Sequence, residues 1–503
     1  MKEPRTLGDL FDLRARDRDA VFLDVPDGSA LRPGSFTYGD TLDGSGRIAH
    51  ALGALGVRPG DRVAVQTEKS PLAVLLYLAC VRAGAVLLPM NPSYSDAEVD
   101  YLIGDAEPSV VVCDPARAER VAAPEVLTVD ARGDGTLAQL AAEQPGDFDD
   151  FARTADDLAA ILYTSGTTGR PKGAMLSERN LTSNAVALHR AWGFRPDDVL
   201  LHALPIFHTH GLFVATNCVL ANGTAMVFLP RFDVDAVLEH LPGSTVFMGV
   251  PTYYTRLLSD GRLDAERCAH VRLFVSGSAP LLATTHDEFF ERTGHAILER
   301  YGMTETSMIT SNPLDGDRRP GTVGFALPGV EVRVMTDGRR CTPGEIGGVE
   351  VRGPNVFSGY WRRPELSTSE FTGDGFFRTG DLGTFDADGY LAIVGRSKDL
   401  VISGGLNVYP KEVEDVLDGL DGVVESAVIG VPDPDFGEAV VAVVVAEPGA
   451  AIEEEPLRAA TRERLAGYKV PKRVHVVEAL PRNSMGKVEK ARLRERFGMP
   501  KEP

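Results

Sequence analysis

Short apolar runs rich in β-branched residues recur through most of the chain, separated by polar turns and by segments with helical spacing. RVAVQTE (62–68), PSVVVCD (108–114) and VRLFVSG (271–277) each have the length and composition of a buried strand, whereas the residues around 71–83 favour a helix. Such alternation is typical of α/β architecture with largely parallel sheets. We therefore predict an α/β fold for the larger part of the chain.

The hydrophobic pattern changes twice toward the C-terminus. From about 321 to 394 the sequence is rich in glycine and in strand-like runs, which predicts a small β-rich subdomain. Beyond GRSKD (395–399), helical patterns at 411–420 and 455–467 flank strand-like runs at 425–433 and 438–447. We expect an N-terminal domain over 1–395 and a small α+β domain over 396–503, which has a usual domain size.

Length, charge and cysteine usage narrow the class of protein. A chain of 503 residues is too long for one core, and its net charge of −20 does not favour nucleic acid or an anionic membrane surface as a partner. The charged N-terminus has no signal-peptide pattern, no run reaches the length of a membrane span, and the five cysteines lack CxxC spacing. These features predict a cytoplasmic protein in which local groups hold any anionic small molecule.

The segment ILYTSGTTGRPKGA (161–174) carries the clearest chemical signal. A strand runs into a loop of glycines and hydroxyl residues that ends near Lys172, and such a loop can bring backbone amides and hydroxyls close to phosphate oxygens. Gly166, Gly169 and Lys172 are too closely spaced for a Walker A loop. A flexible surface loop is the alternative, which the strand and the number of hydroxyls disfavour.

This loop and four later motifs resemble the adenylate-forming enzymes, which comprise acyl-CoA synthetases, luciferases and peptide-synthetase adenylation domains. The later motifs are YGMTE (301–305), RTGD (378–381), GRSKD (395–399) and PRNSMGK (481–487), and they follow in the same order. The resemblance covers nearly the whole chain. It implies a large N-terminal domain with packed α/β sheets, a small mobile C-terminal domain, and the joining of a carboxylate to the α-phosphate of ATP with release of pyrophosphate.

The resemblance also assigns roles to individual residues. Thr304 would contact the α-phosphate, Glu305 would hold Mg²⁺, and Lys487 would hold the α-phosphate and the attacking carboxylate together. Taken alone, Glu305 and Lys487 would be read as solvated side chains and Asp381 as a turn residue. The expected ATP site comprises Thr164, Ser165, Gly166, Thr167, Thr168, Gly169, Lys172, Ser278, Ala279, Glu299, Arg300, Tyr301, Thr304, Asp381, Arg396 and Lys487.

In this family the small domain rotates between two poses, one for each half-reaction. The resemblance places the hinge at Lys398 and the route of the coenzyme A thiol at the turn Ser403, Gly404 and Gly405, although this turn has no distinctive sequence of its own. Because Lys487 must be accessible when the domain has swung away, a lysine acetyltransferase that acts on Lys487 is a further expected partner.

Arg300 stands directly before YGMTE, where aryl- and fatty-acid-activating relatives commonly have a small residue. A buried unpaired guanidinium is costly, so Arg300 needs an anion, and a second carboxylate on the substrate would supply it. HTHGL, GVPTYYTR, SGSAPL and ERYGMTET together resemble malonyl-CoA synthetases. The residues expected at the malonate site are His208, Thr209, Arg256, Ser278, Arg300 and Met303.

Several alternatives remain open at this point. Arg256 could instead pair with Asp260 one helical turn later, and His208 could simply be packed in the core. The acid could be methylmalonate, oxalate or a short fatty acid, with Thr209 and Met303 next to its α-carbon. The chain could also load a carrier protein, or it could be an inactive nucleotide-binding regulator, which the presence of Lys487 and Glu305 disfavours.

Overall fold

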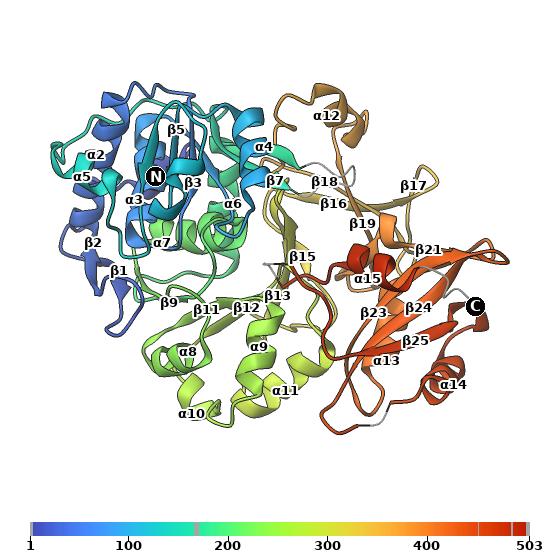
Figure 1. Ribbon diagram of the computed structural model, residues 1–503. Helices are drawn as coiled ribbons and strands as arrows, with labels where there is room; N and C mark the ends of the chain where they lie inside the picture. The colour runs from blue at the N-terminus through green and yellow to red at the C-terminus, as the bar shows by residue number, and fades with distance from the viewer. Residues whose placement is uncertain (1–3, 165–170, 451, 484–485, 499–503) are drawn as a thin grey trace.

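The computed structural model describes residues 4–164, 171–450, 452–483 and 486–498 (Figure 1). Two large sheets form the N-terminal lobe. The first has nine strands in the order β15-β14-β13-β12-β11-β9-β10-β1-β2, and the second has six in the order β6-β5-β3-β4-β7-β8. Parallel pairing dominates the interior of both, with antiparallel strands at both edges of the first sheet and at the β8 edge of the second. This is the α/β architecture expected from the strand–helix alternation.

The strands of these sheets coincide with the apolar runs of the sequence. The first sheet contains β1 (Val21–Val25), β2 (Gly34–Thr37), β9 (Val199–His202), β10 (Ala225–Phe228), β11 (Val246–Gly249), β12 (Leu273–Ser276), β13 (Leu298–Met303), β14 (Ser307–Ser311) and β15 (Phe325–Ala326). The second contains β3 (Arg62–Gln66), β4 (Val86–Pro89), β5 (Val110–Cys113), β6 (Val126–Thr128), β7 (Leu158–Thr164) and β8 (Lys172–Ser177).

Helices join and cover these strands. α3 (Pro71–Ala83) follows an N-capping Ser70 and ends at Gly84, whose φ of 74° a side chain would strain. Because α3 is apolar on all sides, it is buried on all sides. The other helices of this lobe are α1 (Leu7–Phe11), α2 (Tyr38–Ala54), α4 (Asp96–Ala106), α5 (Thr136–Ala142), α6 (Glu178–Ala191), α7 (Asn217–Asn222), α8 (Val234–His240), α9 (Pro251–Leu258), α10 (Ala265–Cys268) and α11 (Ala283–Thr293).

A third sheet of five strands lies between the lobe and the C-terminal domain. Its strands are β16 (Glu331–Thr336), β17 (Arg339–Arg340), β18 (Gly347–Arg352), β19 (Phe377–Phe385) and β20 (Leu391–Arg396), all antiparallel, with α12 (Pro364–Glu370) inserted before β19. β16 to β19 and α12 lie within the segment 321–394 expected to be β-rich, and β20 extends two residues beyond it.

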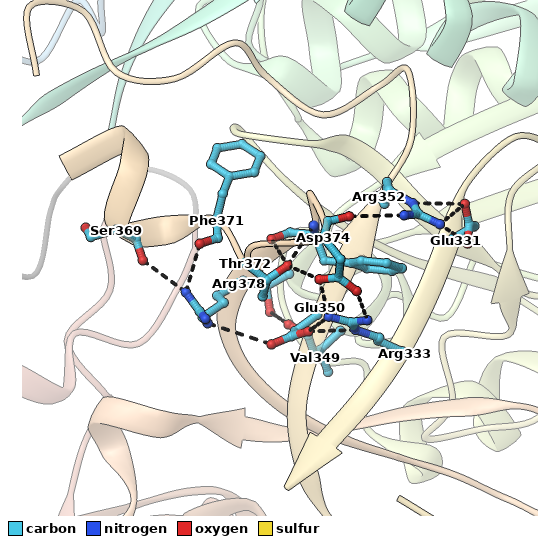
Figure 2. A network of polar contacts seen from close by, with 12 residues as sticks. Glu331, Arg333, Val349, Glu350, Arg352, Ser369, Phe371, Thr372, Asp374 and Arg378 are labelled. Atoms are coloured by element: carbon cyan, nitrogen blue, oxygen red, sulfur yellow. Dashed lines mark hydrogen bonds and ion pairs between the residues drawn. The ribbon is translucent and has the colours of Figure 1, made fainter. Parts of the chain in front are cut away.

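A polar network ties the loop after α12 to this sheet (Figure 2). Arg333 pairs with Glu350 at 2.7 Å and with Asp374 at 2.6 Å, and it lies over the ring of Phe376. Arg378 donates to the carbonyl oxygens of Ser369 and Phe371. The start of β19 is therefore fixed in position by its neighbours.

The C-terminal domain is built on one sheet with helices on both faces (Figure 1). Its elements are β21 (Val401–Ser403), β22 (Leu406–Val408), α13 (Pro410–Asp418), β23 (Val423–Asp433), β24 (Gly437–Ala446), α14 (Glu454–Arg464), β25 (Arg473–Val477) and α15 (Lys490–Phe497). Among the described helices of the whole chain, none is long and apolar enough to cross a bilayer.

Candidate active site

Glu305 lies just after β13, between the end of β7 and the segment that joins β18 to α12. Its buried carboxylate accepts a hydrogen bond from the Tyr360 hydroxyl at 3.0 Å and one from the Thr164 hydroxyl at 3.4 Å. Burial raises the pKa of Glu305, and these two hydrogen bonds oppose the rise. Thr304, directly before it, is partly exposed. The structure thus places the YGMTE turn beside the end of the strand that enters the phosphate loop.

Most of the expected phosphate loop lies outside the described residues, namely Ser165, Gly166, Thr167, Thr168 and Gly169. Both ends of the loop are described. Thr164 ends β7, and Lys172 begins β8 with its ammonium 5.0 Å from the centre of the Tyr360 ring and 3.9 Å from Glu370 Oε1. Lys172 is buried although it belongs to the most hydrophilic residue type, as expected of a cation that is held for an anion.

Asp381 is joined to residues from two other elements. The Tyr301 hydroxyl donates to its carboxylate at 2.5 Å, and Arg396 Nε lies 3.0 Å from the other oxygen. Asp381 faces Arg396 across the β19–β20 ladder, and β19 is itself anchored by Arg378 of the same RTGD motif. Burial and the Asp381 charge raise the pKa of Tyr301, so its phenol stays protonated and donates.

Lys487 reaches this site from the C-terminal domain. Its neighbour Gly486 lies against Thr252 at the start of α9, and the Lys487 charge contributes to lowering the pKa of His208 to about 3, mainly a burial effect. The pKa of Lys487 is itself lowered by crowding protein atoms and by Arg396 and Arg300, while Asp381 and Glu305 oppose this. The residue remains exposed.

Arg300 is buried in the middle of β13, with 3% of its surface exposed. Its Nη2 donates to Ser278 Oγ at 3.5 Å, its Nε has no partner among the described residues, and no described carboxylate lies within ion-pair distance. Burial lowers the pKa of Arg300 to about 9. The positive charge of this buried guanidinium thus has no anionic partner among the described residues, and a bound anion would neutralise it.

The neighbouring residues shape the space around Arg300. Ser278 has a φ of 72°, an uncommon conformation for a residue with a side chain, and it follows Gly277, which lies against the guanidinium. Ala279, next in sequence, is partly exposed. Glu299 does not pair with Arg300, because successive strand residues point to opposite faces; instead its Oε1 accepts from the Leu281 amide at 3.1 Å.

Further polar groups come from the segment after β9. His208 and Thr209 precede a short π-helix, His210–Thr216, and the imidazole of His210 lies 3.4 Å from Ser278 Oγ. Met303 ends β13 and packs against the main core. The structure therefore brings His210, Ser278 and Arg300 into one chain of contacts.

Arg256 is not part of that chain of contacts. Tyr254 faces the core and donates to the Val275 carbonyl oxygen, so Arg256, two residues later on α9, faces solvent. The alternative pairing with Asp260 is also absent, because the described partner of Asp260 is Arg262. The assignment of Arg256 to the malonate site stays a prediction.

The expected hinge and thiol route lie on the segment that follows β20. Lys398 is exposed in a 3-10 turn, Ser397–Asp399, between the third sheet and the C-terminal sheet. Ser403 is buried at the end of β21, and Gly404 and Gly405 form the turn to β22 with positive φ. This turn is on the C-terminal domain, as the motif order requires.

Sequence reasoning did not identify two residues that contact the site. Tyr360 binds Glu305 from a segment with no family motif, and no signal in the sequence marks it. His210 was visible as the second histidine of HTHGL, a motif that the prediction used only for His208 and Thr209.

Comparisons with known proteins identify the family of the chain. The family model described as AMP-binding enzyme matches residues 14–361, and the model for its C-terminal domain matches 412–487. The chain therefore belongs to the AMP-binding enzyme family, whose members have the adenylate-forming fold, and within it to the CoA ligases.

Individual relatives share most of their length with the chain. A feruloyl-CoA synthase from Amycolatopsis is 39% identical, covering 94% of this chain and 96% of the relative, and a malonate–CoA ligase from Arabidopsis thaliana is 35% identical, covering 93% and 83%. The crystal structure of ATP-bound MatB from Rhodopseudomonas palustris is 54% identical, covers 98% of each chain and superposes with a TM-score of 0.95. Apo MatB superposes with a TM-score of 0.83.

Proposed function

We propose that this protein is an ATP-dependent malonate–CoA ligase, which converts malonate, ATP and coenzyme A into malonyl-CoA, AMP and pyrophosphate through a malonyl-adenylate. The observation that carries the proposal is the buried guanidinium of Arg300, which has no carboxylate partner among the described residues. Malonate has one carboxylate to activate and a second, one methylene away, that would neutralise Arg300. A guanidinium is well suited to bind a carboxylate.

The same feature disfavours an aromatic or fatty acid. An apolar tail placed against Arg300 would leave the cation desolvated and unpaired, which costs several kcal/mol in mutational comparisons, roughly 3–5. The similarity to MatB and to malonate–CoA ligases supports this reading. The similarity to a feruloyl-CoA synthase makes a direct test necessary.

In the first half-reaction, the residues of the chain would hold the two anions together. Lys487 would lie between the malonate carboxylate and the α-phosphate and stabilise the charge that develops there. Asp381, oriented by Tyr301 and Arg396, would accept hydrogen bonds from the ribose hydroxyls. Thr304 and the phosphate loop through Lys172 would bind phosphate oxygens.

Mg²⁺ fits the residues present. Glu305 offers a buried carboxylate that accepts two hydrogen bonds. The described residues contain no group of three or more His, Cys, Asp or Glu that could hold a metal without further ligands. Magnesium often takes one or two protein carboxylates and completes its shell with substrate phosphates and water. Glu305 would hold it, and the ion would neutralise charge on the triphosphate.

In the second half-reaction, the small domain would rotate about Lys398 so that Ser403, Gly404 and Gly405 face the adenylate. Glycines at this turn would let the backbone lie close to the pantetheine arm of coenzyme A. Acetylation of Lys487 by an acetyltransferase would remove its charge and stop the first half-reaction. Malonate-dependent pyrophosphate release by protein acetylated only at Lys487 would contradict that regulatory role.

One experiment tests the proposed function directly. Malonate, methylmalonate, oxalate, acetate, butyrate and ferulate would be assayed for acid-dependent AMP formation with coenzyme A, and malonate should give the highest kcat/KM. Methylmalonate is the nearest rival, because only Thr209 and Met303 would meet its extra methyl group. Product formation on a phosphopantetheinyl carrier protein, but not on free coenzyme A, would instead indicate a carrier-loading enzyme.

A further inference from the structure

His210 carries a buried polar atom that the described structure leaves without a partner. The residue is 1% exposed, and its Nε2 is in contact with neither solvent nor any described hydrogen-bond partner. Buried polar atoms of this kind are rare in folded proteins and require an explanation. Two other buried polar atoms also lack a hydrogen-bond partner among the described residues. One is Arg300 Nε, in the same chain of contacts, and the other is Oγ1 of Thr209, the preceding residue.

The position of His210 is tightly fixed from behind. Gly211 packs so closely on Pro205 that an added β-carbon would come within 2.0 Å of the Pro205 carbonyl oxygen. The Gly211 carbonyl oxygen accepts hydrogen bonds from Thr216 Oγ1 and His202 Nε2, both at 2.9 Å. Lys69 in turn donates to the Nδ1 and the carbonyl oxygen of His202, both at 2.8 Å. His210 therefore has little freedom to find another partner by moving.

The contacts on its other side favour a proton on Nε2 of His210. Arg300 can only donate, so Ser278 Oγ accepts from it and has its own proton available for His210 Nδ1, 3.4 Å away. The positive charge of Arg300 also favours the imidazole lone pair on that side of the ring. Burial, with Arg300 adding to it, lowers the pKa of His210, so the ring is neutral. The proton then lies on Nε2, the orphaned atom.

We propose that His210 is a further substrate-binding residue, whose Nε2–H donates to the distal carboxylate that Arg300 also binds. This inference rests on the proposed function, because it assumes a dicarboxylate substrate. It gives the distal carboxylate donors from β13 and from the π-helix, while Ser278, in the turn after β12, links the two side chains. A carboxylate has about four acceptor positions, enough for both donors.

Three substitutions of His210 separate this role from a structural one. His210→Asn keeps an amide nitrogen near the place of Nδ1 and removes Nε2, His210→Gln extends an amide nitrogen toward the place of Nε2, and His210→Phe keeps the ring without either nitrogen. Loss of a hydrogen bond to a charged group predicts a roughly ten- to hundredfold lower kcat/KM for malonate in the Asn and Phe variants. The Gln variant should recover at least part of this loss. The KM for ATP should change much less than the value for malonate.

The ratio of kcat/KM for malonate to that for butyrate is the decisive quantity. It should fall in His210→Asn and His210→Phe and recover in His210→Gln. An equal fall for both acids, or no difference between Gln and Phe, would show that His210 only supports the fold. If Asn does not fold, the comparison of Gln with Phe decides the matter, and if neither of these folds with native stability, the residue is structural and the proposal is wrong.

The same measurements on Arg300→Gly distinguish a failure of the proposed function from a failure of the role proposed for His210. If Arg300→Gly leaves the malonate-to-butyrate ratio unchanged, the proposed function itself is wrong. If that ratio falls in Arg300→Gly but not in the Asn and Phe variants of His210, the proposed function stands and only the role of His210 fails.

Discussion

Gly277 lies directly against the guanidinium of Arg300. A β-carbon at Gly277 would come within 2.5 Å of Arg300 Cζ and 2.6 Å of its Nε. Because real β-carbons do not approach other atoms so closely, Arg300 can keep its position only when residue 277 is glycine. The glycine thus sets the place of the cation proposed to bind the distal carboxylate of the substrate.

Gly277→Ala should therefore act on substrate recognition by displacing Arg300. We expect kcat/KM for malonate to fall by at least tenfold, since a charge-assisted contact is worth about 1.5–3 kcal/mol, with a smaller change in the KM for ATP. Gly243→Ala is the matched control, because an added β-carbon there would meet no atom within 4 Å. Equal kinetics for the two variants would show that Arg300 can shift without consequence.

Lys487→Ala should separate the two half-reactions. A positioned charge at the α-phosphate stabilises the transition state, and removal of comparable groups costs roughly a hundred- to a thousandfold in rate. Malonate-dependent pyrophosphate exchange should fall by at least that amount, whereas preformed malonyl-AMP should still give malonyl-CoA. A similar loss in both halves, in a protein with native circular dichroism, would contradict the assignment of Lys487 to the first pose.

Lys398→Pro should arrest the exchange between poses, since proline fixes φ near −65°. We expect adenylation to survive, because the structure already places Lys487 beside Arg300 and His208, and thioester formation to fail. Lys398→Ala removes the same side chain without the backbone restriction and is expected to retain overall turnover. Wild-type turnover in the proline variant would place the hinge elsewhere.

The buried carboxyl of Glu299 should make the free energy of unfolding depend on pH. Burial raises its pKa to about 8 in the folded protein, against an ordinary value of 4.5. The folded state holds this proton between pH 4.5 and 8 and the unfolded state does not, so the associated stability is lost as pH rises through that range.

Glu299→Gln should remove this dependence. In the absence of ATP, the free energy of unfolding of the variant minus that of the wild type should increase between pH 5 and pH 8, by on the order of a few kcal/mol. Urea titrations at several pH values measure the difference, with the exposed Glu291→Gln as control. A constant difference across this range would mean that Glu299 is ionised in the folded protein.

Much of the fold was predictable because local signals agreed with the tertiary structure. The segment 71–83 is preceded by a capping serine and followed by glycine, and α3 occupies those residues. The apolar runs became strands because buried parallel strands require continuous apolar sequence. The change to glycine-rich sequence coincides with the separate third sheet.

The site was predictable only where a motif carried it. Arg300 stood out because a cation within an apolar strand needs a partner, and the structure confirms its burial. Tyr360, Gly277 and His210 were not predicted, because their contacts with Glu305, Arg300 and Ser278 join segments that are far apart in the chain. The exposure of Arg256 follows from the helical phase of α9, which Tyr254 fixes by facing the core.

Arg300→Gly tests the substrate assignment itself. The change removes the charged contact, worth about 1.5–3 kcal/mol, which lowers kcat/KM for malonate by roughly ten- to a hundredfold. It also removes the cation that disfavours an apolar tail, so activity with butyrate should persist or rise. Arg256→Ala is the comparison variant, and because Arg256 is exposed, it should lower malonate activity less. If malonate falls no more than butyrate in Arg300→Gly, Arg300 is structural and the substrate is not a dicarboxylate recognised at this position.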